Sequence, residues 1–183
     1  MNFDRRRLLL GAAALLAAPA SPAQQCRGTP RDGLGPFYKP NAPAQADLCA
    51  SGSGGTQRLV VAGHVRGMPE CTPLAGALVE VWQADARGDY SQVGAKQDDA
   101  RCLLRASVRT DADGRYAFST IMPSEYPGRP RHIHFRVSAN GYAPLVTQLY
   151  FARERGVPQE LVVTAAPKEG VLAANFDVTL ARS

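Results

Sequence analysis

The chain has 183 residues, of which 45% are hydrophobic and 20% charged, and its formal net charge at pH 7 is +5. A chain of this size and hydrophobic content can bury the core of one domain. Residues 1–23 hold +2 of the net charge, and no basic run interleaved with aromatic residues follows them. The composition therefore gives no reason to expect a partner that is a nucleic acid.

Residues 1–23 have the pattern of a secretory signal peptide, with a basic start, an apolar run and a small-residue end. The apolar run is too short for a membrane span, and no stop-transfer pattern follows it. The arginines Arg5, Arg6 and Arg7 before two leucines are typical of a twin-arginine signal, with an ordinary basic start as the alternative. We expect cleavage after Ala23 and export of an already folded protein to the periplasm or out of the cell.

The segment 24–57 is rich in proline and glycine and is predicted to form an irregular N-terminal arm. Cys26 and Cys49 lie in this arm, and Cys71 and Cys102 follow it. An even number of cysteines in an exported chain favours two disulfides, and the absence of a CxxC pair argues against a zinc ribbon. The sequence does not choose among three pairings. We expect Cys26–Cys49 and Cys71–Cys102, because segments close in sequence meet more easily.

Short strand-like runs follow one another from residue 58 onward, separated by turn residues such as "DADG" and "ANG". None of them shows the 3.6-residue periodicity of an amphipathic helix. The predicted strands are 58–65, 77–84, 103–110, 115–121, 131–138, 144–151, 160–164 and 175–181. This pattern predicts that residues 58–183 form an all-β domain, an antiparallel β-sandwich with long loops and little helix.

The run "HIHFRV" at 132–137 holds two of the chain's three histidines. Side chains alternate between the two faces of a strand, so the isoleucine, phenylalanine and valine of this run can cover the core. His132 and His134 then point together to the other face, about 7 Å apart at Cα. Two imidazoles at this spacing can bind one metal ion, although an isolated HxH is more often part of a solvated polar face. His64 stands alone and is assigned no role.

Two tyrosines strengthen the metal interpretation. Tyr90 lies in a turn after the run 77–84, and Tyr126 lies in a Pro/Gly-rich loop before the histidine strand. Phenolate oxygens and imidazole nitrogens form a donor set that suits a hard, highly charged ion, and such an ion lowers the pKa of a bound phenol. Fe(III) is therefore the expected metal, with Cu(II) as the second choice.

Several motifs together resemble the intradiol ring-cleavage dioxygenases of the protocatechuate and catechol type. They occur in family order and cover most of residues 33–151. The motifs are "GPFY" (35–38), "PLAGALVEVWQADARGDYS" (73–91), "RTDADGRYAFSTIMPSEYP" (109–127), "RPRHIHF" (129–135) and "TQLYF" (147–151).

The resemblance implies a β-sandwich like the intradiol dioxygenase core and a non-haem Fe(III) held by four protein ligands. By motif position these ligands are Tyr90, Tyr126, His132 and His134. The resemblance also implies that Arg129 and Gln148 line the substrate pocket, that Arg129 stabilises the substrate-bound intermediate, and that Tyr126 leaves the metal and accepts a proton when substrate binds.

The implied substrates are O2 and a catechol-type aromatic, and the product is a muconate-type diacid. The resemblance leaves open which catechol is cleaved and whether the chain forms a homo-oligomer. Two alternatives belong to other classes of protein. One is a non-catalytic β-sandwich module that binds aromatic or polysaccharide surfaces, and the other is a structural, disulfide-stapled envelope domain.

Overall fold

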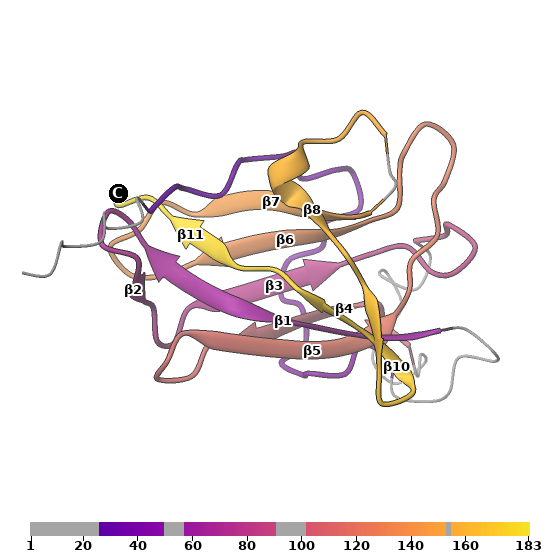
Figure 1. Cartoon of the computed structure of the whole chain (residues 1–183), viewed down its shortest axis with the longest axis horizontal. Coiled ribbons are helices and arrows are strands. Elements are labelled where there is room, and N and C mark those ends of the chain that lie inside the picture. Colours follow the sequence, from indigo (N-terminus) through magenta and orange to yellow (C-terminus); the bar gives the residue numbers. More distant parts are fainter. Residues whose placement is uncertain (1–25, 50–56, 91–101, 153–154) are drawn as a thin grey trace, which may run out of the picture.

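The computed structural model describes residues 26–49, 57–90, 102–152 and 155–183; the predicted signal peptide lies outside these ranges. The described chain forms two β-sheets that share one hydrophobic core (Figure 1). Its one short helical turn is η2 (Gln159–Leu161). This architecture confirms the predicted all-β sandwich. Within the described residues, no helix is long and apolar enough to cross a membrane.

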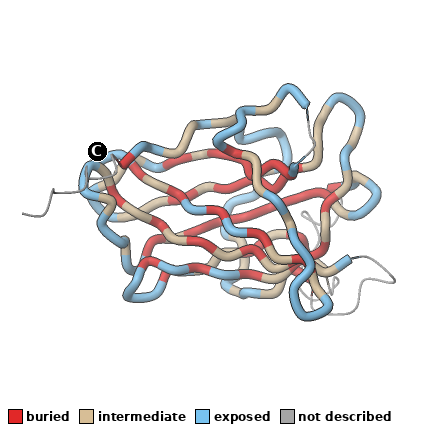
Figure 2. The backbone as a smooth tube through the Cα atoms, viewed as in Figure 1, coloured by how far each residue is buried: buried red, intermediate tan, exposed pale blue. Residues whose placement is uncertain are grey.

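The first sheet is built around β1, a ten-residue strand. Its strands are β1 (Arg58–Gly67), β2 (Thr72–Pro73), β5 (Arg115–Ile121), β9 (Ala166–Lys168), β10 (Val171–Asn175) and β11 (Val178–Leu180). Buried and partly exposed residues alternate along the whole of β1, which is the period-2 pattern of a strand with one face on the core (Figure 2).

The second sheet has the strand order β4-β3-β6-β7-β8. Its strands are β3 (Leu78–Trp82), β4 (Arg105–Arg109), β6 (His132–Ser138), β7 (Leu145–Phe151) and β8 (Val162–Val163). Most strand pairs are antiparallel, but β1 pairs in parallel with β10 and β11, and β7 pairs in parallel with β8. Turn residues show where a chain reverses but not which strand it joins, so the sequence did not predict these parallel pairs.

The core between the sheets is aromatic at its centre. Phe118 on β5 and Phe135 on β6 come from opposite sheets, and their ring centroids lie 6.0 Å apart. Ile133 and Val137, the other apolar members of the histidine strand, are fully buried in the same cluster. The inward face of β6 is therefore apolar, as the alternation predicted, and the histidines lie on its outward face.

Residues 26–49 of the predicted N-terminal arm run over the outer face of the second sheet and are called the arm below. Near its start it contacts β7, where the Asp32 N–H donates to the Val146 carbonyl over 2.9 Å. Further along, Ala44 forms a bridge with Ser107 on β4. The arm therefore shields from water a sheet face that would otherwise be solvated.

The disulfides differ from the predicted pairing. All four cysteines are paired, but as Cys26–Cys71 and Cys49–Cys102. The expected Cys26–Cys49 and Cys71–Cys102 bonds were wrong because the arm crosses the sandwich, which places its two ends beside different strands. Each disulfide therefore joins one end of the arm to the domain beneath it, across 45 and 53 residues.

Candidate metal centre

One row of side chains crosses the outer face of the second sheet. Trp82 on β3 pairs in register with His134 on β6, which pairs in turn with Gln148 on β7. The Trp82 and His134 rings stack, with centroids 4.8 Å apart and planes 2° from parallel. In the next row, His132 lies opposite Tyr150. Strand register alone thus brings both histidines and the predicted Gln148 together.

The two histidines are buried, with 2% of His132 and 1% of His134 exposed. A solvated strand face is therefore excluded for this part of β6. Gly35 lies over the His134 ring; a Cβ at this position would come within 3.0 Å of His134 Cε1, and the backbone has φ +71°. The glycine allows the arm to pack directly on the imidazole.

The imidazole nitrogens converge on each other. His132 Nδ1 lies 2.6 Å from the Pro130 carbonyl, so Nδ1–H donates there and Nε2 carries the lone pair. His132 Nε2 is 3.1 Å from His134 Nε2. Burial lowers the pKa of His134 to about 3, helped by the charges of His132 and Arg129, and burial also lowers the pKa of His132. Both rings are therefore neutral, which is the form that binds metals.

Tyr90 reaches the histidines from a tight turn after β3. Asp85 organises this turn by accepting hydrogen bonds from the N–H groups of Arg87 and Asp89. The Tyr90 hydroxyl lies 3.3 Å from His132 Nε2. The turn packs against the next loop at Gly88, where a Cβ would come within 2.8 Å of the Glu125 carbonyl oxygen.

Tyr126 lies on the loop that Gly88 contacts. Its ring packs edge-on against Tyr90, with centroids 5.7 Å apart, and lies 5.8 Å from the His132 ring. Burial, followed by the charge of Tyr126, raises the pKa of Tyr90. A bound cation would act in the opposite direction on both phenols.

The donor geometry fits a metal ion. Two ligands each about 2.1 Å from a common ion lie about 3 Å apart when they bind at right angles, and the three measured donor atoms are separated by 3.1 and 3.3 Å. Among the described residues, no three His, Cys, Asp or Glu side chains gather at one point. The set therefore depends on phenols as well as imidazoles, which suits Fe(III) better than zinc.

The predicted Arg129 and Gln148 meet beside these donors. Tyr126 and Arg129 close a tight turn through two backbone hydrogen bonds, and Arg129 Nη2 donates to Gln148 Oε1 over 2.6 Å. A cavity opens at this turn and is lined by Tyr126 and Arg129 among others. The structure thus brings all six predicted site residues together, while His64 lies on β1 in the other sheet and contacts Asp177.

Sequence reasoning missed two residues of this network. Tyr150 donates to Asp32 over 2.8 Å, and burial, followed by the hydrogen bond to Asp32, raises the pKa of Tyr150. Tyr150 stands in the same short motif as Gln148 and, two residues along the strand, has the same parity, so a closer look at "TQLYF" could have included it. No pattern marks Asp32, because the arm has no regular secondary structure.

The comparisons with known proteins agree with this fold and site. Residues 34–181 match the family described as "Dioxygenase". Catechol 1,2-dioxygenase 2 of Acinetobacter lwoffii is 41% identical over 143 residues, which cover 67% of this chain and 50% of that protein. Catechol 1,2-dioxygenase of Candida albicans is 34% identical over 168 residues, covering 79% and 54%. This chain belongs to the intradiol dioxygenase family. It spans about half the length of these relatives.

Solved structures show the same similarity. The dioxygenase domain of a dioxygenase–carbohydrate-binding protein fusion from the cellulolytic bacterium Streptomyces sp. SirexAA-E superposes with a TM-score of 0.75 at 34% identity. The match covers 86% of this chain and all of that domain. For 3-chlorocatechol 1,2-dioxygenase from Rhodococcus opacus 1CP the TM-score is 0.74 at 28% identity, over 88% of this chain and 75% of the other.

Proposed function

We propose that this chain is an exported Fe(III) intradiol dioxygenase that cleaves the ring of a catechol-type aromatic with O2 to a muconate-type diacid. The observation that carries the proposal is that His134 Nε2 and the Tyr90 hydroxyl both lie within 3.3 Å of His132 Nε2, in a buried site of a family member. Tyr126, from the facing loop, completes the proposed ligand set.

Burial distinguishes the proposed ligands that stay on the metal from the one that moves. His132, His134 and Tyr90 are buried and held by secondary structure or a capped turn, so they would keep the metal throughout a catalytic cycle. Tyr126 is only partly buried and belongs to a loop, so it can move away and accept a proton from the substrate. The chemistry that Fe(III) supplies when bound is chelation of both catechol oxygens and withdrawal of electron density from the ring.

The surroundings favour an aromatic substrate that gains negative charge. Leu34 and Phe37 flank the glycine that covers His134, and both are exposed, at 39% and 37%. An aromatic ring entering beside them would bury apolar surface. Arg129 would then lie next to the reacting ring as a fixed cation, oriented before the reaction begins.

Export remains part of the proposal. Residues 1–23 carry the predicted twin-arginine signal, the arm follows at 24–57, and the catalytic β-sandwich spans 58–183. The two disulfides support this location, since such bonds persist in oxidising compartments. Changing Arg5, Arg6 and Arg7 to lysine should leave precursor in the cytoplasm, and normal processing of that variant would contradict the twin-arginine signal.

The test of the activity is direct. Protein without residues 1–23 is loaded with iron and mixed with a panel of catechols while O2 uptake is followed. We expect about one iron per chain, a red-brown colour from tyrosinate-to-Fe(III) charge transfer, a shift of this band on addition of catechol, and O2 consumption. Colourless protein that stays inert after iron loading would contradict the proposal and favour the non-catalytic binding module.

A further inference from the structure

The orientation of the buried Gln148 amide is set by the arm. Gln148 is fully buried, and its Nε2 donates to the Gly33 carbonyl over 2.7 Å, with Asp32 Oδ1 at 3.5 Å. Both of these partners are acceptors, so the NH2 end of the amide must face the arm. The carbonyl end then faces Arg129, which donates to it over 2.6 Å.

The direction of the Tyr150 O–H bond is set by the Asp32 carboxylate. It lies 2.8 Å from Asp32 Oδ2 and 3.0 Å from Gln148 Oε1, but it has one hydrogen to donate. A carboxylate is the stronger acceptor, so this hydrogen points to Asp32. With its hydrogen on Asp32, Tyr150 does not donate to Gln148 Oε1, which leaves that oxygen to Arg129.

Arg129 therefore donates to an amide oxygen that is oriented from the arm. We propose that Asp32 is a positioning residue, which fixes the Arg129 guanidinium by holding the Gln148 amide in the orientation that accepts from it and by keeping the Tyr150 hydrogen away from the same oxygen. The proposal rests on the proposed function for its effect on catalysis, but its structural content concerns the metal-free protein as well.

The carboxylate is needed because it can only accept. Its Oδ1 also accepts from the Gly33 N–H over 2.6 Å, and the Gly33 carbonyl accepts from Gln148 Nε2. Asparagine has nearly the same shape, but it would offer an NH2 group to one of these partners. Where this NH2 group faces Tyr150, the Tyr150 hydroxyl has to donate to Gln148 Oε1 instead. Tyr150 then competes with Arg129 for that oxygen.

The first test uses no iron and no activity. In 15N-labelled metal-free protein, the guanidinium N–H signals of Arg129, including those of Nη2, are assigned by their loss in the Arg129→Lys variant, and their hydrogen exchange is measured. In Asp32→Asn we expect exchange about tenfold faster than in the unaltered protein, because an oriented charge-assisted hydrogen bond is lost. Tyr150→Phe keeps the carboxylate and the turn at Gly33 and should show part of this effect. An unchanged Arg129 signal in both variants overturns the proposal.

Asp47→Asn is the matched control. Asp47 is another arm carboxylate with its own partners, the Cys49 N–H at 3.0 Å and Arg58 at 3.0 Å. This variant should leave the Arg129 signal unchanged, and a loss of the signal here would mean that any loosening of the arm disturbs Arg129, which overturns the specific role of Asp32. If the amide signals of the arm show that Asp32→Asn does not fold, Tyr150→Phe decides.

The second test links the network to catalysis. In iron-loaded enzyme we expect Asp32→Asn to lower kcat about tenfold with unchanged iron content, as expected when a catalytic group is displaced. In an Arg129→Lys background the same change should lower kcat by less than about twofold, because Asp32 acts through Arg129. Equal losses in both backgrounds contradict the proposal. If the unaltered enzyme has no activity, the proposed function fails, while the exchange measurement still decides the role of Asp32.

Discussion

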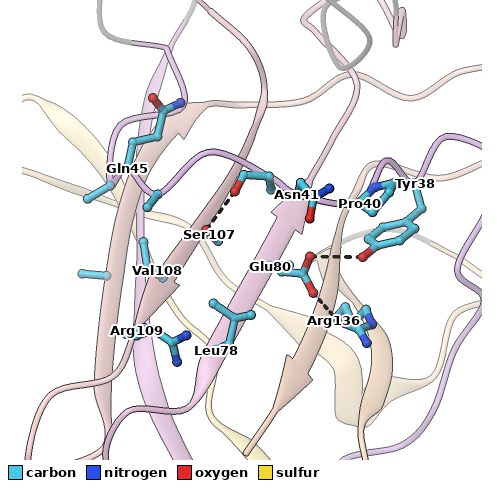
Figure 3. Close-up of a pocket in the computed structure, with 14 residues that line it drawn as sticks. Tyr38, Pro40, Asn41, Gln45, Leu78, Glu80, Ser107, Val108, Arg109 and Arg136 are labelled. Carbon is cyan, nitrogen blue, oxygen red and sulfur yellow. Dashed lines mark hydrogen bonds and ion pairs between the residues drawn. The ribbon is translucent and has the colours of Figure 1, made fainter. Parts of the chain in front are cut away.

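Two neighbouring clusters on the outer face of the second sheet satisfy their polar atoms in different ways. In one, Glu80 on β3 is only 5% exposed, and it accepts hydrogen bonds from Arg136 on β6 and from Tyr38 in the arm (Figure 3). In the other, two residues away along β3 and β6, two neutral imidazoles and a phenol converge.

In the first cluster, the charges of Glu80 and Arg136 balance each other, and it is called the closed cluster below. The cluster of His132, His134 and Tyr90 is called the open cluster. The Glu80 hydrogen bond raises the pKa of Arg136, and burial, followed by the Glu80 charge, raises the pKa of Tyr38, so each donor stays protonated. The second cluster carries no charge of its own, and its ring nitrogens and phenol oxygen lie close enough together for one cation to share them. The groove lined by Tyr38, Glu80 and Arg136 is thus held by its own ion pair and hydrogen bond, while the buried histidines belong to the site that is predicted to bind metal.

The largest effect should come from removing a donor of the open cluster. His132→Ala deletes one of the converging nitrogens, and we expect metal affinity to fall about a hundredfold or more and activity to be lost. Metal analysis after gel filtration measures this directly. His64→Ala is the matched control, because His64 lies on the other sheet; it should remain coloured and active. Iron retained at full stoichiometry by His132→Ala would contradict the assignment.

Tyr126→Phe separates metal binding from proton transfer. Three donors remain, so we expect most of the iron to stay bound, while kcat falls about 10²- to 10⁴-fold because no phenolate accepts the substrate proton. The measurement is iron content together with steady-state O2 uptake. Full activity in this variant would remove Tyr126 from the mechanism.

Breaking the closed cluster should affect stability and leave metal binding intact. Glu80→Gln removes the charge that Arg136 and Tyr38 share, and we expect the free energy of unfolding to fall by about 2 kcal/mol in urea titrations of metal-free protein. Iron stoichiometry should stay at that of the unaltered protein. A variant that loses iron as well would show that the two clusters are coupled.

The smallest effect concerns Asp177, a more exposed carboxylate that accepts hydrogen bonds beside the first sheet, as Glu80 does on the second. Partial burial raises the pKa of Asp177, but hydrogen bonds from Arg66 and from the His64 N–H outweigh it, so the net pKa is lowered. A lowered folded-state pKa means that the stabilisation is present above the unfolded value, about 3.9, and is lost as the pH falls through the folded value. Asp177→Asn should therefore flatten the pH dependence of unfolding below about pH 4, by at most about 1 kcal/mol. Identical curves for the two proteins would contradict this.

The sequence predicted what depends on local alternation. The period of two in "HIHFRV" placed Ile133 and Phe135 in the core and both histidines on the other face, and the structure agrees. The all-β class followed from the same kind of pattern. That these histidines bind iron stays a prediction, as do the roles of Tyr126, Arg129 and Gln148.

What the sequence could not predict depends on long-range placement. The burial of His134 comes from Gly35 in the arm, roughly a hundred residues away along the chain, and no local pattern encodes this contact. The disulfide pairing failed for the same reason, since proximity along the chain says little once a segment crosses a sheet. Asp32 was missed because its partners Gln148 and Tyr150 lie on another element.

The attachment of the arm at both ends limits how it can move. A segment held at one end can swing open, but disulfides at Cys26 and at Cys49 hold this segment against the domain at both ends. All four cysteines are used in these bonds, so no disulfide holds the turn that carries Tyr126 and Arg129, where a cavity opens. This turn, rather than the arm, is then the part of the described site that an incoming ligand can displace.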